Sequence, residues 1–133
     1  MLSKELYGLL INRVINPYIG FIHKEKYGHP ALVSDLIEEW RPVIVDSAVM
    51  SLIRGHEIDT CHFLFDGNSC NITKEGMRIL ITKIEKKMAV STNYLEQIER
   101  SLSFREALWH QADNMSRAID RTDLSFYQAV KIR

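Results

Sequence analysis

Residues 30–42 read PALVSDLIEEWRP, and this stretch decides the fold class. Pro30 suits the first turn of a helix, and Pro42 would end or kink it. Between the two prolines, apolar side chains recur at the spacing of one helix face. They are Leu32, Val33, Leu36, Ile37 and Trp40. The segment therefore predicts an amphipathic helix that buries one face against its neighbours.

The same helical spacing extends to both sides of this segment. A helix is predicted to begin near Leu2 with Ser3 as its N-cap, and to stop at Asn16-Pro17 because the residue before a proline disfavours the α conformation. Another is predicted over about 43–54, with Gly55 placed for a left-handed C-terminal cap. The inward side chains of this helix are expected to be Val45, Val49, Leu52 and Ile53.

The second half of the chain continues the pattern. Thr73 can cap a further helix. The buried side of that helix is expected to consist of Met77, Leu80, Ile81, Ile84 and Met88. Apolar spacing resumes over Tyr94–Leu102 and Phe104–Ile119, as one long helix or two. Asp123 is placed to cap a short terminal turn, and the tail 128–133 is expected to fray.

The residues near 60–73 have a different character. Strand-forming residues at 61–65 and 70–72 flank an Asp-Gly-Asn turn, which predicts a small β-hairpin. Cys61 and Cys70 could pair across it, but two reduced thiols are the favoured interpretation. The fold class is thus mostly α, a single helical bundle-like domain over residues 1–133 with this hairpin attached.

Composition excludes several classes of protein. The 133 residues suffice for one domain, and 17 basic residues balance 17 acidic ones, so the net charge gives no support for binding nucleic acid. No apolar run is long enough to cross a membrane. The N-terminus becomes charged at once and lacks the apolar core of a signal peptide. A cytoplasmic protein without a membrane role is expected.

Chemically reactive side chains are densest between His23 and Arg41. Asp35 and Glu38 are three residues apart, so on a helix their side chains share a face. His23 lies on the loop that leads into this helix and could reach the same face. One imidazole with one or two carboxylates is a reasonable ligand set for Mn²⁺ or Mg²⁺, ions that polarise phosphodiesters and activate oxygen nucleophiles.

A structural interpretation of the same residues remains open. Asp35, Glu38 and Glu39 could form a solvated helix face, and His23 could be an ordinary surface histidine. The three other histidines of the first half of the chain lack a carboxylate at helical spacing or start a helix, and they are interpreted as structural. They are His29, His56 and His62.

Two motifs resemble a known family. Residues 16–23, NPYIGFIH, are similar to its "N/D-P-Y-x-G-F-hydrophobic-His" motif, and residues 35–42, DLIEEWRP, to its "Asp-Leu-x-Glu-x-aromatic-Arg-Pro" motif. Ser103-Phe104-Arg105, followed by Gln111, resembles the family's last core helix. The family is the CRISPR-associated integrase, the endonuclease of spacer acquisition.

This resemblance implies a catalytic role and a set of site residues. It implies a C-terminal, α-helical catalytic domain that cuts and joins DNA with Mn²⁺ or Mg²⁺. His23 matches the family's histidine ligand, Glu38 its later acidic ligand, and Asp35 an acidic neighbour that supports the site. DNA and the small CRISPR-associated subunit of the adaptation complex are the implied partners, and a homodimer is left open. Basic side chains near the site could neutralise phosphates, namely Lys24, Lys26 and Arg41.

The sequence departs from the family at its start. The family's first metal ligand is a glutamate far upstream of the histidine, whereas only 22 residues precede His23. The N-terminal β-rich domain of the family is expected to be absent as well. We therefore expect the chain alone to be inactive or weakly active. The alternative is a non-catalytic module, derived from that domain, that binds DNA or the partner subunit.

Overall fold

The computed structural model describes residues 1–24, 26–93 and 95–132. Helices dominate this part of the chain, which confirms the mostly α fold class. They are α1 (Leu2–Ile11), α2 (Ala31–Glu38), α3 (Ser47–Arg54), α4 (Lys74–Ala89) and α5 (Phe104–Asp120). No helix in the described ranges is both long and apolar enough to cross a membrane.

Short elements connect these helices. A π-helical segment, η1 (Arg41–Asp46), joins α2 to α3. Single 3₁₀ turns lie at η2 (Thr60–His62) and η3 (Leu124–Phe126). Two small antiparallel sheets complete the set, one of β1 (Phe63–Asp66) with β2 (Ser69–Ile72) and one of β3 (Ser91–Thr92) with β4 (Leu102–Ser103).

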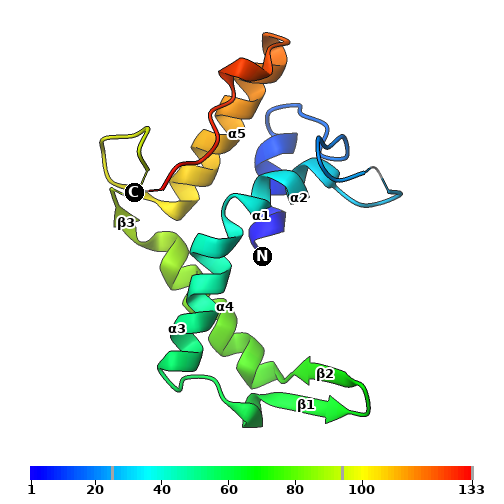
Figure 1. Cartoon of the computed structure of the whole chain (residues 1–133), viewed down its shortest axis with the longest axis vertical. Coiled ribbons are helices and arrows are strands. Elements are labelled where there is room, and N and C mark those ends of the chain that lie inside the picture. The colour runs from blue at the N-terminus through cyan, green and yellow to red at the C-terminus, as the bar shows by residue number, and fades with distance from the viewer. Residues whose placement is uncertain (25, 94, 133) are drawn as a thin grey trace.

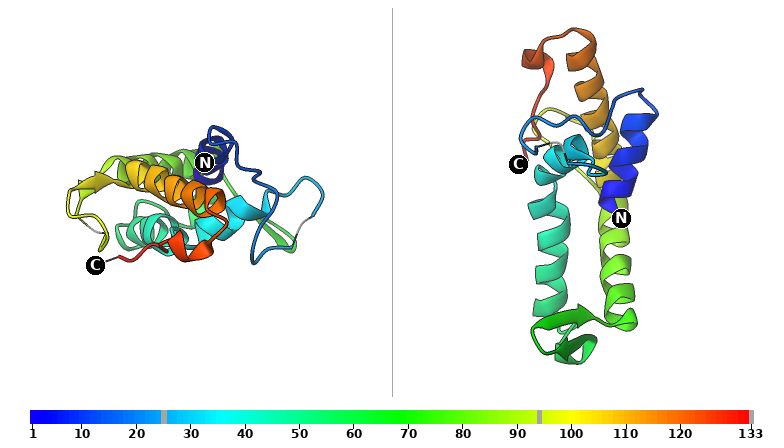
Figure 2. Two further views of the ribbon diagram at one scale, coloured as in Figure 1. Left: turned by 90° about the horizontal axis from the view of Figure 1, so that it is seen from above. Right: turned by 90° about the vertical axis from the view of Figure 1, so that its right-hand side faces the viewer.

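The molecule has a helical body and a projecting arm. In Figure 1, α1, α2 and α5 gather at one end, while α3 and α4 run side by side away from them and end at the β1–β2 hairpin. The right-hand view of Figure 2 shows this arm along its full length. After η3 the chain turns back along α5, and we call residues 127–132 the C-terminal strap.

The core consists of two apolar clusters joined by α5. Leu6, Leu10, Leu32 and Leu36 pack with Met115 between α1, α2 and α5. The second cluster surrounds Trp40, whose ring is fully buried and meets the Phe104 ring edge-on at 6.2 Å between centroids. Because α2 contributes to one cluster and Trp40 to the other, the segment 31–40 is held on both sides of its apolar face.

The hairpin prediction is confirmed. β1 pairs with β2 so that Asp66 lies opposite Ser69, and Gly67 adopts the left-handed conformation, with φ of +54°, that the two-residue turn requires. Cys61 and Cys70 are free and exposed, so they form no disulfide across it. Thr73 caps α4 as predicted, since its hydroxyl accepts a hydrogen bond from the amide of Gly76 at 3.1 Å.

The first helix differs from its prediction at both ends. It ends at Ile11, not at Asn16-Pro17, and Val14 follows with φ of +59°. Ser3 is not the N-cap, because that position is held by Met1 without a side-chain hydrogen bond. The apolar residues beyond Ile11 belong to the turn that carries the chain across the body.

The inward face predicted for the helix over 43–54 is confirmed only in part. Its first part is the π-helical η1, and its buried residues are Ile44, Ala48 and Leu52. Leu52 is inward as predicted and Val45 packs against the core, whereas Ile53 is about half exposed. Gly55 keeps a right-handed conformation, and His56 takes the left-handed one with φ of +52°. Ile53 lies in the last turn of α3, close to the end of the arm.

The face predicted for α4 is partly wrong. Ile84 and Met88 are buried, but Met77 and Ile81 are exposed. These two side chains lie on the arm, where α4 has α3 as its partner and the body no longer covers it.

The prediction of a helix over 94–102 is also wrong. Tyr94 lies outside the described residues, while Leu95 and Ile98 lie in a loop and Leu102 belongs to β4. Leu95 pairs instead with Ile132 of the strap. Because the partner of Leu95 lies far along the chain, the apolar spacing of this segment wrongly predicted a helix.

The C-terminal segment is ordered by contacts that its sequence does not reveal. Asp123 caps η3 as predicted, by accepting from the amide of Ser125. The strap is not frayed, because the Lys131 carbonyl accepts from the amide of Glu96 and the Ala129 carbonyl from the side chain of Gln97. Arg133 lies outside the described residues.

The burial of one face of α2 predicts that truncating a side chain on that face lowers the stability of the fold. Leu36 is 2% exposed, so Leu36→Ala should lower the free energy of unfolding by about 2–5 kcal/mol through lost burial and a cavity. Leu64 is 61% exposed on the hairpin, and Leu64→Ala is the matched control, with an expected change within about 0.5 kcal/mol. Urea unfolding of both variants measures the difference, and equal midpoints would contradict the packing described for α2.

Candidate metal and DNA site

The loop before α2 is anchored at its start by Asn16 and Pro17. The Asn16 side chain accepts from the amide of Tyr18 at 3.0 Å and forms an Asx turn. The Pro17 carbonyl accepts from the amide of Leu32, one of the donors in the first turn of α2 that has no partner within the helix. The loop is therefore fastened to α2 at the point where it must turn back.

Asp35 organises the rest of this loop. One of its carboxylate oxygens accepts from the amides of Phe21 at 2.5 Å and Ile22 at 3.0 Å, and the other from the amide of His23 at 2.9 Å. The second oxygen also contacts His23 Nδ1 at 2.5 Å. Asp35 is buried and fully hydrogen-bonded, so the interpretation of this residue as part of a solvated helix face is wrong.

The hydrogen bonds also set the charge of Asp35. Burial by itself raises the pKa of this carboxyl, but the bonds from Ile22, His23 and Phe21 outweigh it and lower the pKa to about 2. The group is thus ionised at neutral pH and accepts from His23, which places a proton on Nδ1. Nε2 of the imidazole remains as the nitrogen available to a ligand.

Gly20 is required where the loop passes α2. A Cβ at this position would lie 2.8 Å from both the Asp35 carboxylate and the Ala31 Cβ, closer than real contacts allow. A side chain here would push the loop off the carboxylate. The glycine of the NPYIGFIH motif therefore has a physical role, which is to let three successive amides reach Asp35.

Glu38 and the predicted phosphate-binding residues are exposed around this point. Glu38 lies on the last turn of α2 with more than half of its side chain in solvent, and Arg41 approaches it at 3.8 Å. Lys24 and Lys26 are exposed on the loop that follows His23. The structure brings His23 and Asp35 into contact, and leaves Glu38 as an exposed carboxylate one helical turn further on.

Glu39 is not solvated as the sequence suggested. Its two oxygens accept from the Tyr127 hydroxyl at 2.6 Å and the Val130 amide at 2.7 Å. Burial first, and then the bond to Glu39, raise the pKa of Tyr127 well above its usual range, so it remains a donor. Both oxygens of Glu39 are therefore used in holding the strap. Glu25, another carboxylate of this stretch, lies outside the described residues.

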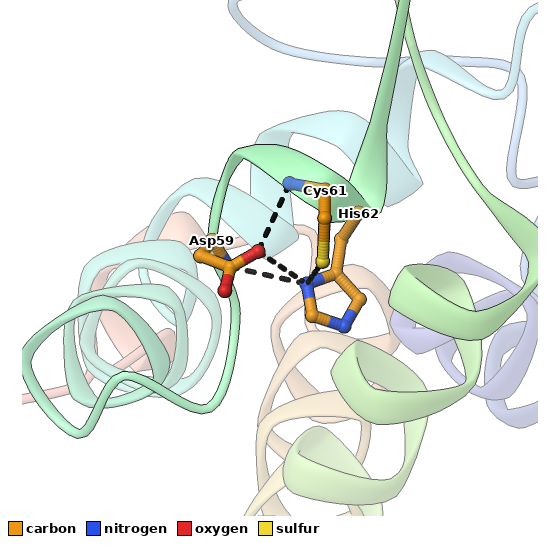
Figure 3. Close-up of side chains that lie close together, drawn as sticks. All are labelled: Asp59, Cys61 and His62. Atoms are coloured by element: carbon orange, nitrogen blue, oxygen red, sulfur yellow. Dashed lines mark hydrogen bonds and ion pairs between the residues drawn. The ribbon is translucent and has the colours of Figure 1, made fainter.

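Among the described residues, three side chains of metal-ligand type converge only at Asp59, Cys61 and His62 (Figure 3). A local turn explains this cluster. Asp59 and His62 form the capping box of η2, in which His62 Nδ1 accepts from the Asp59 amide. The Asp59 side chain also accepts from the Cys61 amide. The nitrogen that would bind an ion is thus already used. His62 is structural, as interpreted from the sequence, although its partner Asp59 was not foreseen.

The spacing of residues in the sequence did not reveal the buried polar contacts between α2, α5 and the strap. Gln111 is buried, accepts from Trp40 Nε1 at 2.8 Å, and donates to the Leu36 carbonyl at 3.1 Å and to the Tyr127 hydroxyl at 3.2 Å. A glutamine on the apolar face of a predicted helix was the available signal, because a buried amide needs partners.

A family model for the CRISPR associated protein Cas1 matches residues 1–86. This range includes both motifs and the whole loop around Asp35. The chain belongs to the Cas1 family.

Curated relatives agree with this assignment. The chain is 34% identical over 119 residues to a CRISPR-associated exonuclease Cas4/endonuclease Cas1 fusion of Rhodospirillum rubrum, which covers 90% of this chain and 20% of that protein. It is 30% identical over 122 residues to a CRISPR-associated endonuclease Cas1 of Mycobacterium tuberculosis, with 90% and 36% covered. The chain thus spans about a fifth to a third of these relatives.

Solved structures share the fold at low sequence identity. A casposase bound to integration product matches with a TM-score of 0.81 at 19% identity, over 92% of this chain and 33% of that one. A CAS1 protein from Thermotoga maritima matches with a TM-score of 0.75 at 18% identity, over 90% and 36%. A partial Cas6-RT-Cas1–Cas2 complex matches with a TM-score of 0.76 at 19% identity, over 96% and 38%.

The low pKa of Asp35 predicts a pH dependence of stability. Because the folded-state pKa of about 2 lies below the ordinary 3.8, the ionised carboxylate stabilises the fold above about pH 4. This stabilisation, about 2 kcal/mol, is lost as the pH falls through about 2. Asp35→Asn should flatten the pH profile of unfolding in this range and also destabilise the fold at pH 7, since one of its atoms cannot accept from the loop amides.

The control for this experiment is Asp66→Asn, an exposed aspartate on the hairpin. It should keep the wild-type profile. Chemical unfolding between pH 2 and 5 in the presence of a chelator measures all three proteins, and an Asp35→Asn profile parallel to wild type would exclude the carboxylate as the titrating group.

Replacing two glycines by alanine is predicted to change the stability of the fold in opposite directions. Gly20→Ala should destabilise the fold by about 1–3 kcal/mol, because its Cβ would collide with Asp35 and Ala31. Gly8 lies within α1, and a methyl group added there would meet nothing within 4 Å, so Gly8→Ala should stabilise by about 0.5–1 kcal/mol. Thermal melting of both variants is the measurement, and shifts of the same sign would contradict the close approach at Gly20.

Proposed function

We propose that this chain is the α-helical, C-terminal catalytic portion of a Cas1-type integrase, a domain that cuts and joins DNA during CRISPR spacer acquisition. The observation that carries the proposal is the loop 20–23, which Asp35 holds so that His23 presents a free Nε2 beside α2. A histidine whose other nitrogen donates to a buried carboxylate is the usual arrangement of a metal-binding imidazole.

His23 and Glu38 are the proposed metal ligands, and Asp35 orients His23. The donor set fits a divalent ion with mixed nitrogen and oxygen ligands, and the imidazole favours Mn²⁺ over Mg²⁺. A bound ion would polarise a DNA phosphodiester and lower the pKa of the attacking hydroxyl. The protein's own residues fix the direction of the imidazole and keep a carboxylate exposed one turn away.

Three exposed basic residues surround this position and are proposed to neutralise DNA phosphates. Lys24 and Lys26 lie on the loop after His23, and Arg41 lies beside Glu38. Their placement near the site compensates for a net charge of zero over the chain. The proposed partners are DNA and the small subunit of the adaptation complex; one structural neighbour is a Cas6-RT-Cas1–Cas2 complex.

A second candidate is a non-catalytic module that binds DNA or that small subunit. It is favoured by one observation: His23, Asp35 and Glu38 do not converge within the described residues as a cluster of three ligand atoms. Metal binding and activity therefore need separate tests.

The metal site predicts weak Mn²⁺ binding that depends on two residues. Titration of Mn²⁺, followed by electron paramagnetic resonance, should show one site in the wild type that is lost in a His23→Ala, Glu38→Gln double variant. His56→Ala, Glu75→Gln is the matched control, since both residues are exposed on the arm, and it should bind as the wild type does. Equal binding by the two double variants would exclude the site.

A metal ion held only by His23 and Glu38 would be poorly positioned. We therefore predict that the 133 residues alone carry out no detectable strand transfer. Phosphoryl transfer depends on placing the reacting groups, and a displacement of about 1 Å can cost on the order of a hundredfold in rate. The measurement is integration of a labelled DNA fragment into a supercoiled repeat-containing plasmid, with and without a β-rich domain of the family added in trans. Efficient integration by the chain alone would show that another carboxylate completes the site.

A further inference from the structure

The last turn of α2, which carries Glu38, is held from two sides. From the core, the Gln111 side chain donates to the Leu36 carbonyl, one of the acceptors at a helix end that lack an intrahelical partner. From the surface, Glu39 accepts from Tyr127 and from the backbone of Val130. Glu38 lies between these two attachments in sequence.

The two attachments form one continuous network. Trp40 donates to Gln111, Gln111 donates to the Tyr127 hydroxyl, and Tyr127 donates to Glu39. Every donor in this network comes from α5, the strap or the buried end of the segment 31–40. A carboxylate that accepts two short bonds in a half-buried position has few alternative rotamers, so it fixes the backbone to which it belongs.

The strap itself is firmly placed. Val130 and Ile132 pack against the cluster around Trp40, and Tyr127 packs against the cluster between α1, α2 and α5. Its backbone pairs with the loop at Leu95 and Glu96. The strap therefore provides a rigid support for Glu39, although it lies 88 to 91 residues further along the chain.

We propose that Glu39 is a positioning residue for the metal site: by tying the end of α2 to Tyr127 and Val130 of the C-terminal strap, it sets the direction of the neighbouring Glu38 carboxylate. This inference rests on the proposed role of His23 and Glu38 as metal ligands. Glu39 itself would not bind the ion, because its two oxygens accept hydrogen bonds from Tyr127 and Val130.

The test compares Glu39→Ala with Glu96→Ala. Glu96 is an exposed glutamate in the loop that pairs with the strap, and it holds the strap only through its backbone amide. Two properties are measured at a temperature where every variant is folded: Mn²⁺ affinity, and hydrogen exchange of the Trp40 amide, which bonds to the Ile37 carbonyl at the end of α2. A loss of global stability alone would leave the Mn²⁺ affinity unchanged.

Glu39→Ala is expected to weaken Mn²⁺ binding by about tenfold, in the range found for residues that orient metal ligands, and to accelerate exchange at Trp40. Glu96→Ala should match the wild type in both. Glu39→Gln, which keeps the shape and one acceptor oxygen, should fall between them. Tyr127→Phe added to Glu39→Ala should have no further effect on affinity, because the two residues act through one bond.

The outcomes separate this inference from the function on which it rests. Wild-type protein that binds no Mn²⁺ at His23 and Glu38 would remove the metal site, and the positioning role with it. Wild-type binding with unchanged affinity in Glu39→Ala would overturn the positioning role alone, whatever the exchange rate. Unchanged exchange at Trp40 in Glu39→Ala would also overturn it, since the end of α2 would then not depend on the strap.

Discussion

The buried carboxylate of Asp35 is the constraint on which the candidate site depends. An ionised group out of water must be paired, and three consecutive amides and an imidazole fulfil this need. The same bonds fold the loop, select the tautomer of His23 and require a glycine at position 20. One electrostatic requirement thus determines the shape of a segment that has no regular secondary structure.

A second group of polar contacts, around Gln111, holds the end of α2 from the core side. Gln111 and Trp40 satisfy each other inside the apolar core, and the amide of Gln111 extends the contact to α2 and to the strap. Buried polar groups with all partners present specify one arrangement of the surrounding elements more sharply than apolar packing does. These bonds join α2, α5 and the strap within the body, while the arm of α3, α4 and the hairpin extends away from it.

Much of this structure could be predicted from the sequence. The helical class, the hairpin, the Thr73 and Asp123 caps and the pairing of His23 with an acidic neighbour follow from local spacing and from the two motifs. The failures have a common physical origin in long-range contacts. Leu95 pairs with Ile132 of the strap and not with a helical neighbour, and Glu39 has its partners 88 and 91 residues away. Neither the capping role of Pro17 nor the buried state of Asp35 can be inferred from periodicity.

The π-helical segment after Trp40 has a consequence for how the chain tolerates changes in length. A π turn accommodates one residue more than an α turn, and each residue of an α-helix rotates the next by about 100°. After this segment, Ala48 and Leu52 continue the buried face that begins at Ile44. A single deletion between Arg41 and Asp46 is expected to restore a regular helix and to leave α2 and α3 in nearly the same relative orientation, because the wider turn absorbs the extra residue locally. The segment between the body and the arm is therefore a place where the chain is expected to tolerate the loss of one residue without a change in the direction of the arm.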